Sequence, residues 1–155
     1  MHSVYIVEVI VQMNTETKAL INKGEMLPLM EEFYTIQGEG AHTGKAAYFI
    51  RIGGCDVGCH WCDVKESWDA NLHPPTHTDT IITNAKKYAN TVVITGGEPL
   101  MWSLDYITKQ LQKDGIKTHI ELLAPMRFLV FGTGFVCRQK RQNYPCSALT
   151  KKPTN

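Results

Sequence analysis

Three of the five cysteines in this chain lie within eight residues of one another, in the stretch GGCDVGCHWCD at residues 53–63. Cys55, Cys59 and Cys62 can offer their thiolates together only to something that binds all three. They can hold three irons of a 4Fe–4S cluster and leave the fourth iron open to a ligand. Alternatively, the same cysteines and His60 can hold a structural zinc ion. An odd number of cysteines, three of them clustered, favours a reducing, cytoplasmic setting over a disulfide framework.

The bulk properties are those of a globular protein with one core. The chain has 155 residues, of which 43% are hydrophobic and 20% charged, and such a length can bury a sizeable core. The opening MHSVYIVEVIVQ lacks a basic start and a cleavage site, and no apolar run reaches about 18 residues. We therefore expect neither a signal peptide nor a membrane span. A net charge of +1 indicates no nucleic-acid or membrane partner.

Hydrophobic periodicity predicts an α/β fold. Apolar runs predict strands at the start of LMEEFYTIQGEG and over residues 46–52, 91–95 and 116–121. Helical spacing predicts one helix over residues 80–89 and another that begins at a Ser103 cap and ends at Gly115. Residues 69–79 read as an irregular connection. The short alternation of strands and helices predicts βα units on a parallel sheet, the opening portion of an incomplete (βα) barrel.

Charge and pattern divide the chain into three parts. Residues 1–25 are weakly patterned and read as an N-terminal extension, in which Met13 is an alternative start to Met1. Residues 26–121 form the predicted core. Residues 122–155 hold six of the sixteen basic residues and none of the fifteen acidic ones. Residues 1–121 therefore carry a net charge of −5. Such a shift marks a basic tail or a tail of different origin.

Two separated motifs together resemble the radical S-adenosylmethionine (SAM) superfamily. The C-x-x-x-C-x-x-C loop follows a strand and has an aromatic residue before its third cysteine, and TGGEP at residues 95–99 follows a later strand. The resemblance implies a 4Fe–4S cluster whose open iron is chelated by the amino and carboxylate groups of SAM. Cleavage of SAM then gives a 5′-deoxyadenosyl radical that abstracts a hydrogen atom. The residues implied to bind this cofactor are Trp61, Gly96, Gly97 and Glu98, and glycine allows backbone to approach a ligand closely.

A longer block narrows the resemblance. EEFYTIQGEGAHTGKAAYFIRIGGCDVGCHWCD is similar to the start of the 7-carboxy-7-deazaguanine synthase family. That family converts 6-carboxy-5,6,7,8-tetrahydropterin to 7-carboxy-7-deazaguanine and ammonia, on the route to queuosine and other deazapurines. An arginine fork suits a carboxylate because it donates two parallel bonds. By this resemblance the pterin would contact Ile36, Gln37, Gly38 and Thr95, and its carboxylate would contact Arg51.

The resemblance carries further expectations and one departure. It implies a homodimer and an electron donor such as flavodoxin. Many members bind Mg²⁺ through a threonine two positions after the third cysteine, but Val64 stands there and offers no oxygen to a hard cation. Two alternatives remain open. One is another radical SAM protein, such as an activase that makes a glycyl radical, and the other is a non-catalytic zinc-binding module.

The resemblance runs from about Met26 to Glu121. The family would continue with Glu-Thr-Ser-Gly, Trp-Asp-Trp and then Ser-Pro-Lys, which contacts SAM, whereas this chain continues ELLAPMRFLVFGTGFVCRQK. The codons ACT TCT GGC encode Thr-Ser-Gly, and read one base later they give Leu-Leu-Ala, as found at residues 122–124. The same shift turns Trp-Asp-Trp into the Gly-Thr-Gly of residues 132–134, and Ser-Pro-Lys into the Arg-Gln-Lys of residues 138–140.

We therefore hypothesise a single-base deletion near the Glu121 codon, and we expect the chain as written to be a poor catalyst. The alternative for residues 122–155 is a natural basic tail that binds RNA.

Overall fold

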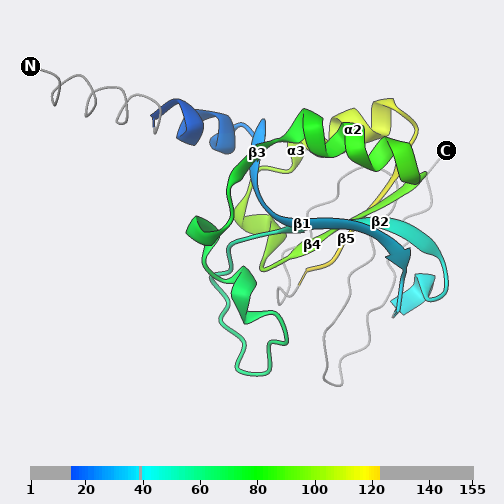
Figure 1. Cartoon of the computed structure of the whole chain (residues 1–155), viewed down its shortest axis with the longest axis horizontal. Coiled ribbons are helices and arrows are strands. Elements are labelled where there is room, and N and C mark those ends of the chain that lie inside the picture. The colour runs from blue at the N-terminus through cyan, green and yellow to red at the C-terminus, as the bar shows by residue number, and fades with distance from the viewer. Residues whose placement is uncertain (1–14, 39, 123–155) are drawn as a thin grey trace, which may run out of the picture.

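The computed structural model describes residues 15–38 and 40–122. Within them, five strands form one open sheet in the order β3-β1-β2-β4-β5, and two helices lie over one of its faces (Figure 1). The elements in chain order are β1 (Met26–Ile36), β2 (Ala46–Ile52), β3 (Pro75–His77), α2 (Thr78–Tyr88), β4 (Thr91–Gly96), α3 (Asp105–Lys113) and β5 (Lys117–Ile120). The predicted α/β class is confirmed.

The sheet is mixed rather than parallel throughout. β2, β4 and β5 run parallel, as predicted, with Ile50 opposite Ile94 and Ile94 opposite Ile120. β1 runs antiparallel to both β2 and β3, so the expectation of a wholly parallel sheet is wrong there. The reason is the length of the connection. Only residues 37–45 join β1 to β2, and a parallel crossover needs about a dozen residues or more.

β3 is the strand that the sequence did not predict. It lies within residues 69–79, which were predicted to be an irregular connection because they contain residues such as Pro74 and Pro75. Pro75 is its first residue, and β3 is an edge strand that pairs only with β1 among the described elements. A proline is tolerated at such a place because no ladder hydrogen bond is lost.

The strands β2 and β4 have two different buried faces. Tyr48, Ile50 and Ile52 point to the helices, where Ile81, Ala85, Ile107 and Leu111 complete the main core. Ala47 and Phe49 alternate with them and form a smaller cluster with Val93 and Phe33. Because side chains alternate along a strand, Arg51 and Thr95 belong to this second face. Burial of each large aliphatic side chain in the main core stabilises the fold by about 1.5–3 kcal/mol.

The helices match the predicted ranges within two residues at most ends. At the start of α3 the N-cap is Leu104 rather than the predicted Ser103, and no side chain caps the helix. The Ser103 carbonyl instead lies against Gly24, where even a Cβ atom would collide with it. Gly115 ends the helix as predicted, with φ +72° and its N–H donating to the Gln112 carbonyl.

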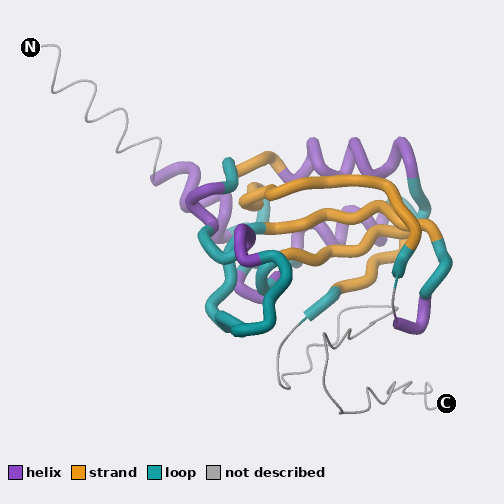
Figure 2. The backbone as a smooth tube through the Cα atoms, turned by 60° about the horizontal axis from the view of Figure 1, so that its bottom comes forward, coloured by secondary structure: helices purple, strands orange, loops and turns teal. Residues whose placement is uncertain are grey.

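A helix over residues 15–22 lies inside the stretch read as a weakly patterned extension. The following turn is tied to the core, since the buried Thr78 hydroxyl donates to the Gly24 carbonyl at 2.7 Å. Among the helices of the described residues, none combines the length and apolar character needed to cross a bilayer. The smooth trace shows loops at both ends of the sheet, with the larger group of them at the left-hand end (Figure 2).

Candidate active site

The cysteine loop begins where β2 ends and is anchored there by its own backbone. Gly53 N–H donates to the Pro28 carbonyl at 2.8 Å, and Gly54 N–H donates to the Ser67 carbonyl at 2.6 Å. Gly54 has φ +102°, a conformation that glycine adopts without strain. Trp102 covers this turn, with its indole N–H on the Gly53 carbonyl at 2.8 Å. The turn therefore holds the loop at the carboxyl edge of the parallel strands.

The three cysteines are brought together with free thiols, each half-buried. They line one pocket, whose other lining residues are Trp61, Trp68, Thr95, Gly96, Gly97, Glu121 and Leu122. Burial raises the pKa of the Cys59 thiol, and the neighbouring Cys55 and Cys62 raise it further. Three thiolates here repel one another, so their deprotonation is favoured when a cationic group binds them.

Two groups were considered as ligands of the three cysteines, a single zinc ion and a 4Fe–4S cluster. Within the described residues, no set of three or more His, Cys, Asp or Glu side chains is arranged to hold a single metal ion. Tetrahedral zinc with bonds of about 2.3 Å needs its sulfur ligands close together, whereas a 4Fe–4S cluster places each thiolate on a different iron. His60, the other zinc ligand considered, is exposed and packs edge-on against Trp61. His60 also does not line the pocket that the three cysteines line.

Gly96, Gly97 and Glu98 are joined to the cysteine loop. Gly97 N–H donates to the Ile52 carbonyl at 3.0 Å, and Glu98 N–H donates to the Gly54 carbonyl at 2.8 Å. A Cβ atom on Gly96 would overlap the Ile52 backbone, and one on Gly97 would overlap the Gly54 carbonyl. The two glycines are thus required by the contact between strand ends, a reason beyond the approach of a cofactor.

Glu98 is buried, with 5% of its surface exposed. Its carboxylate accepts a hydrogen bond from Leu100 N–H at 3.2 Å and so caps the short 3₁₀ turn η4 (Pro99–Met101). Its charge is also close enough to Cys59 to raise the pKa of that thiol. Glu98 therefore lies near Cys59 but does not line the cysteine pocket, and it serves as a local cap.

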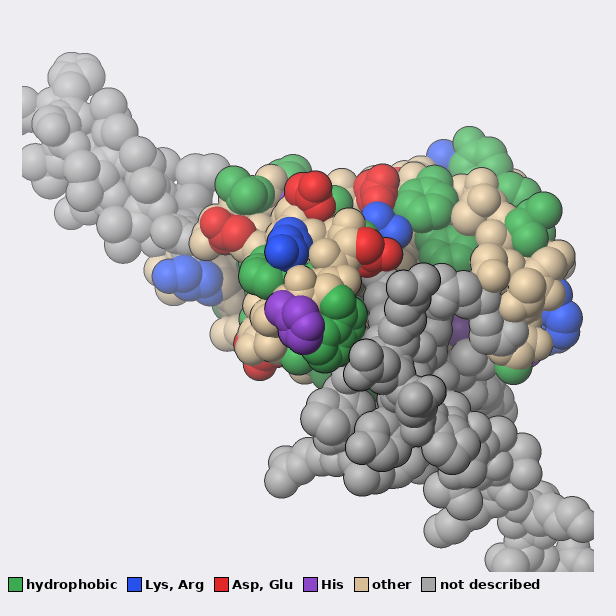
Figure 3. Space-filling model, turned by 90° about the horizontal axis from the view of Figure 1, so that it is seen from below, with side chains coloured by type: hydrophobic (Ala, Val, Ile, Leu, Met, Phe, Trp, Pro, Cys, Tyr) green, Lys and Arg blue, Asp and Glu red, His purple; other side chains and the backbone are tan. Residues whose placement is uncertain are grey.

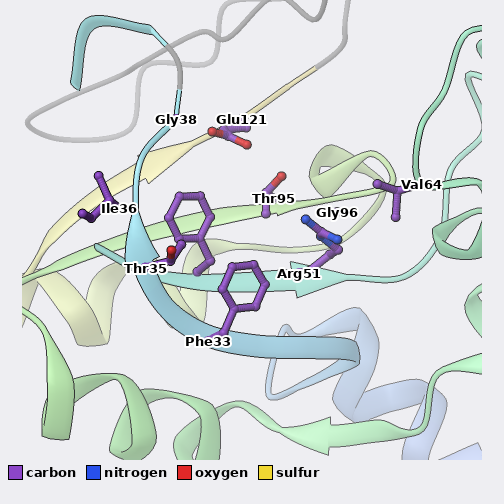
Figure 4. Close-up of a pocket in the computed structure, with 10 residues that line it drawn as sticks. Phe33, Thr35, Ile36, Gly38, Arg51, Val64, Thr95, Gly96 and Glu121 are labelled. Atoms are coloured by element: carbon purple, nitrogen blue, oxygen red, sulfur yellow. The ribbon is translucent and has the colours of Figure 1, made fainter. Parts of the chain in front are cut away.

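A second pocket lies on the face of the sheet opposite the helices (Figure 4). Its lining residues are Phe33, Thr35, Ile36, Gly38, Phe49, Arg51, Val64, Thr95, Gly96 and Glu121. Thr95, Gly96 and Glu121 line both pockets, so the two adjoin at the carboxyl ends of β4 and β5. Figure 3 views the molecule from this side and shows acidic and basic side chains lying next to one another.

Arg51 is held on two sides in this pocket. Its Nη1 donates to Glu31 Oε1 at 2.6 Å across the β1–β2 pair. Its guanidinium lies 5.7 Å from the centroid of the Phe33 ring, within the range of a cation–π contact. Phe33 in turn stacks on Phe49, with centroids 5.5 Å apart and planes inclined by 3°. The result is an oriented guanidinium beside a flat apolar wall.

The residues predicted for the pterin separate into two groups. Ile36, Gly38, Arg51 and Thr95 line the second pocket. Gln37 does not line it. Its side chain is buried, and its Nε2 has no hydrogen-bond partner among the described residues. A buried amide donor without a partner costs about 1–3 kcal/mol. Val64 lines the pocket where a threonine would offer an oxygen.

Sequence reasoning missed four lining residues, Phe33, Thr35, Phe49 and Glu121. A signal for three of them was present, since Phe49 and Arg51 alternate on β2, and Phe33 and Thr35 alternate on β1. Trp68 was missed as well, because nothing in its local pattern distinguishes it from a core tryptophan.

Comparison with known proteins agrees with this geometry. The family model described as Radical SAM superfamily matches residues 49–129. The 7-carboxy-7-deazaguanine synthase of Flavobacterium psychrophilum is 69% identical over 106 residues, which cover 68% of this chain and 50% of that protein. The enzyme of the same name from Synechocystis sp. is 47% identical over 95 residues, 61% of this chain and 46% of that protein. The chain spans about half the length of these curated relatives.

A solved structure is also similar. The crystal structure of QueE from Escherichia coli aligns with a TM-score of 0.67 and 30% sequence identity, covering 77% of this chain and 63% of that chain. The fold is therefore shared with a solved structure over 77% of this chain.

Proposed function

The chain belongs to the radical SAM superfamily, and on that premise we propose that its described residues form the cluster-binding and substrate-binding parts of a 7-carboxy-7-deazaguanine synthase. The proposed reaction converts 6-carboxy-5,6,7,8-tetrahydropterin to 7-carboxy-7-deazaguanine with loss of ammonia. The observation that carries the proposal is the junction of the two pockets. One is lined by three cysteines and the other by Arg51, and they share Thr95, Gly96 and Glu121.

Membership in the superfamily implies a 4Fe–4S cluster and SAM, and when bound they supply a carbon radical that removes a hydrogen atom from the substrate. The described residues fit these groups. Three free thiols line one pocket, and Gly96 and Gly97 leave no side chain between that pocket and the strand ends. In this proposal Cys55, Cys59 and Cys62 bind the irons, while Trp61, Gly96, Gly97 and Glu98 surround the cofactor.

The second pocket supports a flat, carboxylated substrate. Arg51 can donate to the pterin carboxylate with guanidinium N–H groups other than the one on Glu31. The stacked pair of Phe33 and Phe49 offers an apolar wall to a planar ring. Ile36, Gly38 and Thr95 also line this pocket. The proposed contact of Gln37 with the pterin rests on the family resemblance alone, since its buried side chain does not line the pocket.

The remaining parts of the proposal follow from the family resemblance. We expect a homodimer that takes electrons from a donor such as flavodoxin. Free, clustered thiols suit a reducing, cytoplasmic setting. Val64 offers no oxygen ligand, so we expect turnover without the Mg²⁺ dependence that a threonine would confer.

The experiment is an anaerobic assay on a version of the chain whose reading frame is restored after Glu121. With SAM, dithionite and 6-carboxy-5,6,7,8-tetrahydropterin, it should form 7-carboxy-7-deazaguanine, detected by mass. Cleavage of SAM without consumption of the pterin would contradict the substrate. Iron incorporation without cleavage of SAM would contradict the reaction class.

A further inference from the structure

Trp68 contacts both ends of the cysteine loop. Its backbone carbonyl accepts the N–H of Cys55 at 3.1 Å. Its indole Nε1–H donates to the Sγ atom of Cys62 at 3.4 Å, within the distance for a hydrogen bond to sulfur. One residue therefore holds the first and the third cysteine at the same time, although neither the sequence pattern nor the resemblance assigned it a role.

Trp68 is itself held firmly. It follows the short turn η2 (Lys65–Ser67), and its own N–H donates to the Lys65 carbonyl at 3.0 Å. Ser67, with 1% of its surface exposed, donates through its hydroxyl to the Val64 carbonyl at 2.7 Å. The Ser67 carbonyl accepts Gly54 N–H at 2.6 Å. These bonds fix the backbone from which the indole extends, and the bond to Cys62 Sγ orients the ring.

A positive charge lies on the other side of the indole. The Lys65 ammonium is 5.8 Å from the centroid of the Trp68 ring, within reach of a cation–π interaction. The ammonium draws electron density toward it and so makes the indole N–H a better donor. Lys65, Trp68 and Cys62 thus form a chain of contacts that ends on a sulfur atom.

We propose that Trp68 is a positioning residue for the cluster, which fixes the orientation of Cys62 and raises the reduction potential of the iron–sulfur centre. The inference rests on the proposed function, since it requires that Cys62 bind iron. A hydrogen bond to a thiolate sulfur stabilises the reduced cluster, which carries one more negative charge, over the oxidised cluster. An external one-electron donor therefore reduces the centre more easily with the bond than without it.

The test compares two tryptophan variants of the full chain after anaerobic reconstitution. Trp68→Phe removes the donor to sulfur, while Trp102→Phe removes a matched indole donor whose acceptor is the Gly53 carbonyl. Iron and sulfide are measured, and the reduction potential is determined by a redox titration followed by electron paramagnetic resonance. Trp68→Phe should shift the potential to a more negative value, and Trp102→Phe should leave it unchanged. Equal potentials in wild type and Trp68→Phe, or equal shifts in both variants, would overturn the inference.

A second substitution covers the case in which Trp68→Phe loses the cluster. Replacing Trp68 by 3-benzothienylalanine keeps the size and shape of the side chain and removes only the N–H. It should bind the cluster and show the same negative shift, and a wild-type potential here would refute the role of the N–H. The binding of the cluster and the effect of Trp68 on its potential can be tested separately. A wild-type chain without iron and sulfide would refute the cluster and with it this inference, whereas a full cluster at unchanged potential would refute the inference alone.

Discussion

Arg51 already binds a carboxylate in the structure, which belongs to Glu31 at 2.6 Å. The pair keeps the guanidinium turned along the pocket wall beside Phe33. The planar fork of an arginine has donors left for a second carboxylate. At the scale of single residues, contact of Arg51 with the substrate stays a prediction, and the structure adds Glu31 as the residue that orients the guanidinium.

Arg51→Ala, in the frame-restored chain, should keep the iron content and raise the KM for the carboxylated pterin or lower turnover. Truncating one partner of a buried charge pair costs about 2–5 kcal/mol, and we expect the lower end because the Arg51 side chain is 24% exposed. Steady-state kinetics with iron analysis measures both effects.

Glu31→Gln is the matched control for Arg51. It removes the exposed ion pair, which contributes about 0–1 kcal/mol, and keeps the guanidinium. Its KM should change far less than that of Arg51→Ala. Unchanged kinetics in Arg51→Ala would remove Arg51 from the site.

At the scale of elements, the critical contact joins the ends of β2 and β4. Gly97→Ala would push a Cβ atom against the Gly54 carbonyl and to within 2.9 Å of the Cys55 Cβ. Overpacking of this kind costs about 1–3 kcal/mol. We expect a lower free energy of unfolding in the metal-free chain and weaker retention of iron. Urea unfolding and iron analysis measure the two quantities.

Gly38→Ala is the control for that prediction, because no atom lies within 4 Å of a Cβ placed at Gly38. It should unfold like the wild type. A Gly97→Ala protein as stable as Gly38→Ala would show that the close contact between the strand ends is not needed.

β5 carries a histidine that should make stability depend on pH. Burial lowers the pKa of His119 from its usual 6.5, and His42, Lys117 and Lys45 lower it further. His42 stacks on it with centroids 4.3 Å apart. Below about pH 6.5 the unfolded chain takes up a proton that the folded chain resists. The free energy of unfolding should therefore fall as the pH drops below 6.5, by at most about 1.4 kcal/mol per pH unit.

The check is urea unfolding between pH 5 and pH 7 for wild type, His119→Gln and His77→Gln. The fall should be smaller in His119→Gln and unaltered in His77→Gln, since His77 is exposed on the edge strand β3. Parallel pH profiles for all three proteins would contradict a protonation at His119.

The same elements show what the sequence could and could not predict. β2 was predicted at its observed bounds, because AAYFIRI is a continuous run of strand-forming residues. The direction of β1 was missed because hydrophobic periodicity finds a strand but not its partner, and the length of the 37–45 connection was the informative quantity. The cysteines and glycines were found because their chemistry is local. Glu121 and Trp68 were missed because only the folded sheet and loop bring them to the site.

At the scale of the whole molecule, the described strands form an open sheet in which β5 is an edge strand. The part of the basic tail over residues 123–155, with Cys137 and Cys146, lies outside the described residues, and so do residues 1–14 and 39. We retain the division into an extension over 1–25, a core over 26–121 and a tail over 122–155 as a proposal. Gly24 bonds to Thr78, which supports a core that begins slightly earlier than residue 26.

The chain as written should form less 7-carboxy-7-deazaguanine than the frame-restored version. Its tail has Arg-Gln-Lys at residues 138–140 where the family resemblance implies Ser-Pro-Lys at the SAM site. Radical chemistry also requires a site closed to water and side reactions. Product formation by both proteins under one set of anaerobic conditions measures the difference. Equal turnover would mean that RFLVFGTGFV supplies a substitute for the missing motifs.

The origin of the tail has an independent test in the gene. Sequencing across the Glu121 codon should reveal one lost base, and an intact frame would refute the deletion. Salt-sensitive RNA binding that disappears on removal of residues 122–155 would instead favour the natural basic tail.

The most direct measurement is the iron and sulfide content of the chain after anaerobic reconstitution, with cysteines changed one at a time. We expect about four irons and four sulfides per chain, as a 4Fe–4S cluster requires. Cys59→Ala should abolish the brown chromophore, while Cys137→Ala and Cys146→Ala should keep it. Loss of the chromophore in either tail variant to the same extent as in Cys59→Ala, or a chain that binds zinc and no sulfide, would contradict the cluster site of Cys55, Cys59 and Cys62.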